Sequence, residues 1–460
     1  MNDTGLCGAS QEIYYEDILG ENPLFDNFKG GLTENYVFNQ LTINGLSLYY
    51  WTSGSQAEVD FITRIGNDII PVEVKAKINN RSRSLGVYVD RYKPAYSIRI
   101  SQKNFGFENN IKSYQALCDA HGKENWPMIK THKSSAVAKM QMDAGATGFL
   151  CGTIDECEMV YNLGAKHIMY AYPVANPVNI QRILKMAKDT DIIIRLDTVA
   201  AAEMLNAAAE EAGIVVSYTI IVDMNFHRFG MPVEDVVPFA KALAPMKNLK
   251  FRGISTHPGQ VYGCTDYAGV VEIAKLEIET MQAAADALAE AGFPCEMITS
   301  GSTPTFKEVV TKGATTVSHP GNYTFLDNIQ MALGVAEEKD CALRILATVI
   351  SNPHEGFYLF DAGAKCMGLD QGAHGNSAIT GFGKVVGHPE LTIVGLSEEV
   401  AKVKSLNGDP CDLKVGDKVE IIPNHSCSSA NNTTWYTCVR GDEVVDSIEV
   451  DYRGNNHKKF

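Results

Sequence analysis

Hydrophobic positions in the first hundred residues form short runs separated by turn residues. Aromatic and β-branched side chains dominate runs such as LSLYYWTS and EVDFITRI, and Gly-Ser, Gly-Asn and Asn-Asn pairs break them. Such residues suit a pleated surface, so the pattern predicts strands. One helix is expected first, at residues 32–41. A strand meander is expected to follow, with strands at residues 46–53, 58–65, 68–77 and 96–101.

From about Ile111 the pattern changes to short apolar strands that alternate with longer amphipathic helices. Repeated strand–helix units indicate a parallel α/β fold, and a (β/α)8 barrel fits the roughly 230 residues available. The strands are expected at residues 146–152, 167–172, 191–197, 215–224, 249–256 and 295–301. Amphipathic helices are expected between them at residues 134–145, 178–189, 199–213 and 269–292.

After about Ala342 the chain returns to strand-like runs such as ALRILATVISN and DKVEIIPN. These runs predict a third, mainly β domain. The expected domains are therefore residues 1–110, 111–341 and 342–460.

Composition adds mainly exclusions. The chain has 460 residues, 45% hydrophobic and 21% charged, which is ordinary for a globular protein. No apolar run approaches the roughly 20 residues of a membrane span, and the acidic N-terminus lacks the apolar core of a secretory signal. A net charge of −15 argues against nucleic-acid binding without a local basic patch. Eleven cysteines without paired spacing favour the cytoplasm over a disulfide framework.

One lysine stands where barrel enzymes carry out their chemistry. In PMIKTHKSSAVAKMQ, Lys130 ends an apparent strand just before a helix. Catalytic groups of such barrels lie at that end of the strands, and a lysine there can form a Schiff base with a cofactor aldehyde. Taken alone, however, a KTHK string is more often a solvated loop.

The segment KTHK, followed by a helix and GATGFLCGTIDECEMV, resembles the start of the D-threonine aldolase and D-serine dehydratase family. These are pyridoxal-phosphate enzymes of the alanine-racemase barrel class. Further motifs follow in the family's order: VDMNFHRFGM, RGISTHPGQVYG, TSGSTPTF, SHPGNYTFLDN, FDAGAKCMGLDQG and IIPNHSC. The resemblance covers about residues 111–456. It implies an α/β fold in which a (β/α)8 barrel of the alanine racemase N-terminal type precedes a C-terminal β domain.

The resemblance also implies roles for particular residues. Lys130 is implied to be the Schiff-base lysine, which moves the substrate's α-proton once the substrate amine frees it. Arg228 is implied to lie near an anionic oxygen of the cofactor or substrate, and His257 against the cofactor ring; a surface arginine and a structural histidine are the alternatives. Two turns are implied to bind the cofactor phosphate, although both are also compatible with ordinary barrel turns. Their residues are Ser300, Gly301, Ser302 and Thr303 in the first turn, and Gly321, Asn322 and Tyr323 in the second.

A metal site is expected at His425 and Cys427 in PNHSC. Alternate residues of an extended strand point to one face, so the two side chains can present nitrogen and thiolate to one ion. These ligands favour zinc over manganese or magnesium, with manganese still possible. In relatives the metal lies beside the β-hydroxyl of the substrate.

The expected enzyme is thus a lyase that uses pyridoxal phosphate and a divalent metal on D-3-hydroxy amino acids. Loss of the β-hydroxyl gives D-serine dehydration, whereas cleavage of the Cα–Cβ bond gives D-threonine retro-aldol products. A thiolate ligand such as Cys427 resembles the metal ligation of the zinc-dependent dehydratases. This resemblance favours dehydration over aldol cleavage. The fold class also implies a homodimer.

The N-terminal segment carries a separate group of polar residues. Asp60 lies on one expected strand, Glu73 and Lys75 lie on the next, and Glu34 precedes them on the expected helix. Carboxylates and a lysine on adjacent strands can hold Mg²⁺ at a phosphodiester. The segment resembles the PD-(D/E)xK nuclease fold, as found at the C-terminus of bacterial AAA-type ATPases, and implies an α+β nuclease-like fragment. The alternative function is therefore a DNA-acting nuclease-type module joined to a non-functional barrel that has lost its first strand.

Overall fold

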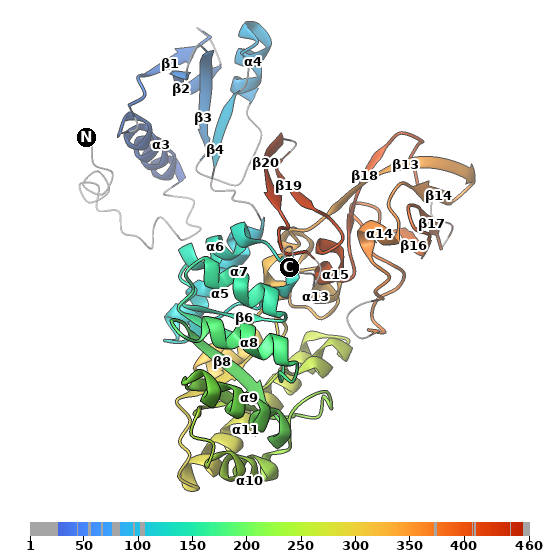
Figure 1. Ribbon diagram of the computed structural model, residues 1–460. Helices are drawn as coiled ribbons and strands as arrows, with labels where there is room; N and C mark the ends of the chain where they lie inside the picture. The colour runs from blue at the N-terminus through green and yellow to red at the C-terminus, as the bar shows by residue number, and fades with distance from the viewer. Residues whose placement is uncertain are drawn as a thin grey trace. The chain divides into compact units, whose positions relative to one another are not determined.

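The chain divides into two compact units (Figure 1). Unit 1 consists of residues 1–104 and 440–443, and unit 2 of residues 105–439 and 444–460. The computed structural model describes residues 26–43, 45–53, 57–65, 68–75, 83–94, 97–101, 106–371, 375–406, 408, 411–441 and 443–453.

Unit 1 contains a four-stranded sheet in the order β1-β2-β3-β4. The first three strands are antiparallel neighbours, but β3 and β4 are parallel because helix α4 connects them. The expected meander is therefore wrong at its last step, although all four strands were predicted. The elements are α3 (Asp26–Ile43), β1 (Leu48–Thr52), β2 (Glu58–Ile65), β3 (Asp68–Lys75), α4 (Arg83–Tyr92) and β4 (Ile98–Ser101).

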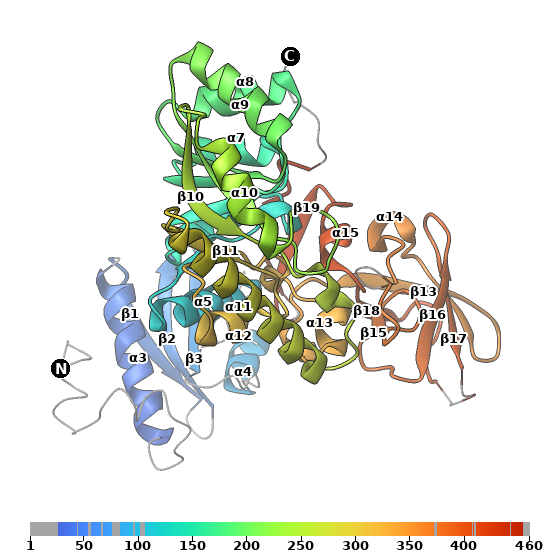
Figure 2. The ribbon, with the colours of Figure 1, turned by 90° about the horizontal axis from the view of Figure 1, so that it is seen from below.

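Unit 2 begins with a parallel eight-stranded sheet in the order β5-β12-β11-β10-β9-β8-β7-β6. Figure 2 labels two of these strands, β10 and β11. A parallel bridge between Met128 and Leu150 joins the residues after β5 to β6, so the sheet closes into a barrel. The strands are β5 (Glu124–Asn125), β6 (Gly148–Cys151), β7 (His167–Tyr170), β8 (Asp191–Leu196), β9 (Val216–Ile221), β10 (Leu249–Ser255), β11 (Met297–Ser300) and β12 (Val317–Ser318).

Helices alternate with these strands, as the periodicity predicted. They are α5 (Gly106–Ala120), α6 (Ser135–Asp143), α7 (Ile154–Asn162), α8 (Pro177–Met186), α9 (Val199–Ala212), α10 (Val233–Leu243), α11 (Tyr267–Glu290) and α12 (Phe306–Lys312). Short 3₁₀ turns are η2 (Ile129–Thr131), η3 (Gly259–Gly263), η4 (Asn322–Thr324) and η5 (Glu338–Asp340).

The barrel sheet has eight strands, although β5 and β12 were not among those expected from the sequence. The strand expected to be lost would precede helix α5, whereas β5 follows α5, so that loss stays a prediction. Both β5 and β12 have two residues each, too few to show a hydrophobic period. They pair with each other, Glu124 opposite Val317 and Asn125 opposite Ser318.

Alternate strand residues divide the barrel core into two hydrophobic clusters. On β8, Ile192 and Ile194 belong to the large cluster that includes the surrounding helices, whereas Ile193 belongs to a second, smaller cluster. That second cluster fills the barrel interior, because successive side chains of a strand point to opposite faces. Its buried members are Trp126, Met128, Leu150, Met169, Ala171, Ile193, Met297 and Val317. A Cβ on Gly148 would lie 2.7 Å from the Trp126 ring, so the indole requires glycine there.

The remainder of unit 2 is an antiparallel six-stranded sheet in the order β15-β18-β13-β14-β17-β16. Its strands are β13 (Ile345–His354), β14 (Phe357–Phe360), β15 (Lys384–Val385), β16 (Leu391–Leu396), β17 (Ala401–Ser405) and β18 (Lys418–Ile422). Strands β15 and β16, the two ends of this order, also contact each other through the short turn that joins them. A separate pair, β19 (Trp435–Arg440) and β20 (Glu443–Glu449), follows. Three short helices complete this part: α13 (Asn328–Ala332), α14 (Ala364–Met367) and α15 (Ser426–Ala430).

No helix in the described part of the chain is long and apolar enough to cross a membrane. The ten cysteines within the described residues are all free thiols. The domain boundaries given above stay a prediction.

Candidate active site

Two residues from the C-terminal part of the chain hold the loop that carries Lys130. Lys130 lies half-buried in η2, one turn beyond the end of β5 and not at the end of a strand. The Asn431 side-chain amide donates to the carbonyl oxygens of Lys130 (3.2 Å) and Thr131 (3.3 Å). The Tyr436 hydroxyl donates to the carbonyl of His132 over 2.8 Å. The C-terminal part of unit 2 therefore positions the barrel lysine.

His425 and Cys427 come together, but not on a strand as predicted. Strand β18 ends at Ile422, His425 is the N-cap of α15, and Cys427 lies in the first turn of that helix. The physical reason is a cap supplied from elsewhere in the chain: the Asp327 carboxylate accepts the Ser426 N–H over 2.8 Å and starts the helix.

The two side chains form an electrostatic pair. Burial by itself lowers the pKa of His425, but the Cys427 thiolate and the Asp327 carboxylate outweigh burial and raise it well above its ordinary value. Burial raises the pKa of the Cys427 thiol, but His425, Lys130 and the Thr131 hydroxyl together lower it below its ordinary value. The pair thus favours a thiolate beside an imidazolium.

These groups fit a divalent cation. His425 Nδ1 is buried and has no hydrogen-bond partner among the described residues; Asp327 Oδ2 lies 3.6 Å away. An ion bound by imidazole and thiolate would replace the proton that the pair shares, and such a donor set suits zinc.

One cavity of about 410 Å³ brings the lysine and this pair together. Its lining residues are Lys130, Lys133, Gly152, Thr153, Glu156, Tyr172, His425, Cys427 and Ser428. Lys133 Nζ forms an ion pair with the fully buried Glu156 (2.7 Å), and the other Glu156 oxygen accepts the Gly152 N–H over 2.6 Å. The cavity wall beside Lys130 is therefore rigid and charged.

The two predicted phosphate-binding turns lie against each other. The Tyr323 N–H donates to the Thr303 hydroxyl over 3.0 Å. A Cβ on Gly301 would lie 2.7 Å from the backbone of His319, so this close approach requires glycine. The second turn also contacts the segment that carries His425 and Cys427, called the metal-type pair below. The Asn322 amide donates to the hydroxyl of Ser426, the residue between them, over 2.9 Å.

Unsatisfied polar groups in these turns fit a phosphate. Among the described residues, no acceptor contacts the N–H groups of Gly301, Ser302, Gly321 or Asn322. The hydroxyl oxygen of Ser302 is buried and unpartnered within the same part of the chain. Backbone N–H groups and small hydroxyls of this kind bind phosphate oxygens.

Two residues of these turns have other contacts. The Ser300 hydroxyl donates to the buried carboxyl of Glu277, whose pKa burial raises to about 8. The Tyr323 ring is fully buried, and its hydroxyl accepts from the Gln141 amide over 3.0 Å. Both side chains are thus engaged within the protein. Ser300 and Tyr323 would therefore contribute to phosphate binding through the turns that they stabilise.

Arg228 and His257 line a second, small cavity of about 20 Å³. The exposed Arg228 guanidinium lies over the rings of Phe226 (4.8 Å) and Phe229 (5.5 Å). His257 Nδ1 is 2.8 Å from the carbonyl of Gly301 in the first turn. Burial, then the nearby charges of Lys130 and Arg228, lower the pKa of His257 to about 3, so this ring is neutral.

Some residues that build the site escaped sequence reasoning. Asp327 lies in the quoted SHPGNYTFLDN motif, and its Asp-Asn pair before a helix is a recognisable cap signal. Lys133 lies in the quoted KTHK segment, but only the fold reveals its partner Glu156. Arg195 is the penultimate residue of β8 and lies in the barrel interior, where its Nε donates to Ser255 over 2.8 Å. Burial and the charge of Arg228 lower the pKa of Arg195 to about 10.

The nuclease-type residues lie in unit 1 by themselves. Glu34 is exposed on α3, whereas Asp60 is half-buried on β2 and Glu73 is buried on the paired strand β3. Asp60 Oδ2 accepts the backbone N–H of Val74 over 2.6 Å, so the two acidic positions lie side by side. The side chain of Lys75 lies outside the described residues, and a nuclease-like site stays a prediction.

A closed parallel barrel with a lysine just beyond its first strand, joined to an antiparallel β domain, defines an alanine-racemase-like protein. Family models agree: residues 106–328 match the alanine racemase N-terminal domain and residues 342–439 match a serine dehydratase domain. Residues 29–117 match a family described only as a domain of unknown function, DUF4143.

The D-threo-3-hydroxyaspartate dehydratase of Delftia sp. (strain HT23) is 29% identical over 357 residues, which cover 74% of this chain and 93% of that protein. The D-serine dehydratase of Dictyostelium discoideum is 28% identical, covering 70% of this chain and 88% of that protein. The chain belongs to the D-threonine aldolase and D-serine dehydratase family over this region.

Solved structures agree with this assignment. The Delftia sp. HT23 dehydratase superposes with a TM-score of 0.69 at 28% identity, covering 76% of this chain and 96% of that one. A D-threonine aldolase from Filomicrobium marinum superposes with a TM-score of 0.68 at 22% identity, which shows the fold alone. One variant of the dehydratase has a cysteine replaced by alanine and is in the metal-free form.

Buried histidines give the stability a pH dependence. Burial lowers the pKa of His132 to about 4, and the pKa values of His257 and His319 to about 3, from 6.5. The unfolded chain therefore binds more protons than the folded chain below pH 6.5, so stability is full above that pH and falls on acidification toward pH 3.

The His132→Gln variant is expected to lose stability less steeply between pH 6 and pH 4, by up to roughly 1.4 kcal/mol per pH unit. Urea unfolding at several pH values measures this slope, with His121→Gln, an exposed histidine, as the control. Equal slopes for His132→Gln and the unmodified protein would contradict the assignment.

Proposed function

We propose that this protein is a lyase that uses pyridoxal phosphate and a divalent metal on D-3-hydroxy amino acids. One observation carries the proposal: Lys130, His425 and Cys427 line the same cavity. An amine that can hold the cofactor then faces a pair that can hold an ion. The dehydratases and aldolases among the relatives support this reaction class.

The chain provides a distinct group for each part of the cofactor. Lys130 Nζ would bind its aldehyde, and the free N–H groups of Gly301, Ser302, Gly321 and Asn322 would bind its phosphate. Pyridoxal phosphate, when bound, withdraws electrons from the substrate Cα. The neutral His257 and the guanidinium of Arg228 are proposed to lie beside the ring and an anionic oxygen, respectively.

His425 and Cys427 would hold the metal, with zinc favoured by the thiolate and manganese possible. A bound ion acts as a Lewis acid on the β-oxygen of the substrate. Lys130 Nζ is proposed to take the Cα proton once the substrate amine has replaced it. Asn431 donates to the carbonyls of both Lys130 and Cys427, so it fixes the distance between the lysine loop and helix α15, which would hold the ion.

Dehydration is the proposed outcome, with retro-aldol cleavage as the competing one. Loss of the α-proton and the β-hydroxyl from D-serine ends in pyruvate and ammonia. Cleavage of the Cα–Cβ bond of D-threonine ends in glycine and acetaldehyde. The thiolate of Cys427 favours the first, as the resemblance to zinc-dependent dehydratases implies. The cytoplasm is the proposed location, in keeping with the free thiols.

Purified protein is expected to convert D-serine to pyruvate, and D-threonine to 2-oxobutyrate, faster than it releases glycine. Lys130→Ala is expected to abolish both turnover and the yellow absorbance that borohydride bleaches. Lys139→Ala is the matched control, because Lys139 is exposed, forms an ion pair with Asp143 and does not line the cavity. Full activity of Lys130→Ala would disprove the role of this lysine. Glycine as the sole product would show that the reaction is aldol cleavage and not dehydration.

Asp327→Asn is expected to raise the Zn²⁺ concentration needed to restore half-maximal activity about 10–100-fold after chelation. The carboxylate that faces His425 is lost, whereas Lys130, whose amine gives the cofactor absorbance, is retained. Because Asp327 also accepts from the Asn322 amide in the second turn, the absorbance is compared at saturating cofactor, where it should stay unchanged. Asp266→Asn, which alters only the cap of α11, serves as control. An unchanged Zn²⁺ requirement would argue against metal binding by this pair.

We also propose a homodimer, because this fold class completes its site with the β domain of a second chain. Sedimentation velocity is expected to give twice the 50.2 kDa of one chain. A monomer that turns over D-serine at the full rate would refute the dimer and leave the reaction untouched.

A further inference from the structure

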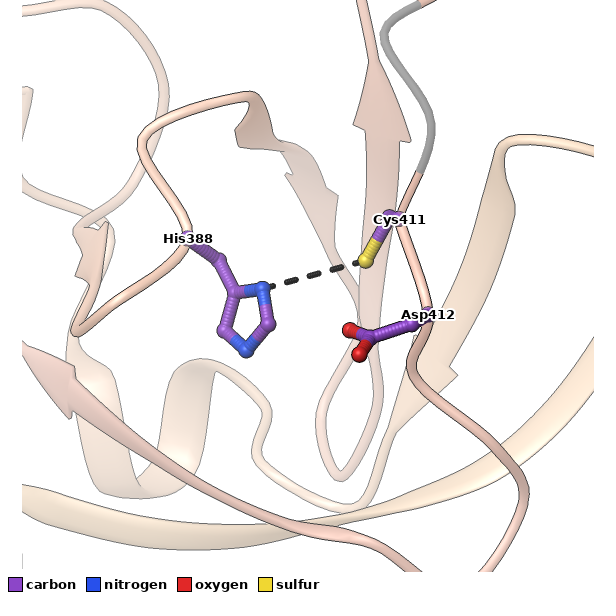
Figure 3. Close-up of side chains that lie close together, drawn as sticks. All are labelled: His388, Cys411 and Asp412. Atoms are coloured by element: carbon purple, nitrogen blue, oxygen red, sulfur yellow. Dashed lines mark hydrogen bonds between the residues drawn. The ribbon is translucent and has the colours of Figure 1, made fainter.

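We propose a second metal site in the β domain, formed by His388, Cys411 and Asp412 with Glu390 as fourth ligand, that binds zinc for stability. It shares no residue with the proposed catalytic pair. The three side chains point toward one another (Figure 3).

The distances suit one ion. A ligand atom from each of His388, Cys411 and Asp412 lies within 4.8 Å of the other two. His388 Nδ1 is 3.8 Å from Cys411 Sγ and 2.9 Å from Glu390 Oε1. A tetrahedral zinc ion with bonds of about 2.0–2.3 Å holds its ligand atoms roughly 3–4 Å apart. Small rotations of the side chains therefore admit the ion.

The backbone around these ligands is already ordered. His388 and Glu390 lie in the turn between β15 and β16, where the Leu391 N–H donates to the carbonyl of His388 over 3.1 Å. Cys411 and Asp412 lie in the connection from β17 to β18, and the Tyr358 hydroxyl on β14 donates to the carbonyl of Cys411 over 3.2 Å. Ligands from two distant chain segments thus meet on a preformed sheet.

The donor chemistry indicates zinc. The imidazole, the thiol and the Asp412 carboxylate gather in a small volume, and the Glu390 carboxylate lies against the imidazole. Once the thiol is deprotonated, a dication would offset two of the three negative charges. Nitrogen and thiolate donors select zinc over calcium and magnesium. The side chains of His388 and Glu390 are 22% and 17% exposed, so a hydrated ion can reach them.

A bound ion would cross-link two segments of the β domain and so stabilise it. The connection between β17 and β18 lacks strand pairing over its described residues, and the thiols of the described chain form no disulfide that could hold it. An ion would tie this connection to the β15–β16 turn. A four-ligand protein site leaves no position for substrate, so its loss should affect stability and not turnover.

Zinc counting on the full chain tests the site, and the Cys427→Ala background removes the proposed catalytic ion. After dialysis against micromolar Zn²⁺, Cys427→Ala protein is expected to keep about one zinc per chain by mass spectrometry. Adding His388→Ala and Cys411→Ser should remove it and lower Tm in zinc. Adding Cys366→Ser instead should change neither quantity, because Cys366 is a half-buried thiol of the same domain that lies outside the proposed site and donates to the carbonyl of Gly363.

Cobalt provides a readout that does not depend on how the His388 and Cys411 variants fold. Co²⁺ added to zinc-free Cys427→Ala protein is expected to give a thiolate-to-metal absorption band that Zn²⁺ displaces. The absence of both the band and stoichiometric zinc would overturn the proposal. Retention of zinc after the His388 and Cys411 substitutions would overturn it equally. Separately, Cys411→Ser alone should leave D-serine turnover unchanged. The zinc count and the cobalt band do not depend on the proposed function, so the two proposals can fail independently.

Discussion

The side-chain amide of Asn431 is the contact on which the site depends. It donates to the carbonyls of Lys130, Thr131 and Cys427, with the shortest distance, 2.7 Å, to Cys427. One planar group therefore sets the position of the barrel lysine relative to the metal-type pair. Asp327 complements it from the barrel side, because its carboxylate caps α15 and faces His425. Neither contact is a property of the barrel or of the β domain alone.

Much of the fold could be predicted because its hydrophobic pattern is long and regular. Strands such as β8 and β9 and helices such as α9 and α11 carry several periods each. The two-residue strands β5 and β12 carry none, so their pairing becomes visible only when the barrel closes. Helix α4 was missed because its sequence, RSLGVYVDRY, is rich in the β-branched and aromatic residues that favour strands.

The site was predictable at the level of residue types and less so in geometry. Motif resemblance selected Lys130, His425 and Cys427, and the structure places all three around one cavity. The expectation of a strand at PNHSC failed, because a carboxylate almost a hundred residues earlier in the chain caps a helix there. The partnership of Lys133 with Glu156 likewise depends on a contact that no local pattern encodes. Long-range contacts, and not composition, decide these details.

The five-residue helix α15 has a consequence for how this enzyme family can diversify. Its N-cap and first turn carry the two metal-type ligands, and Asn431 at its end clamps the lysine loop. Replacing the helix would disturb the proposed proton transfer and the proposed ion binding together, so selection for a different substrate cannot readily act there. Thr153, Tyr172 and Ser428 line the same cavity without belonging to that clamp. Substrate preference among homologues is therefore expected to vary through such wall positions while the clamp is kept.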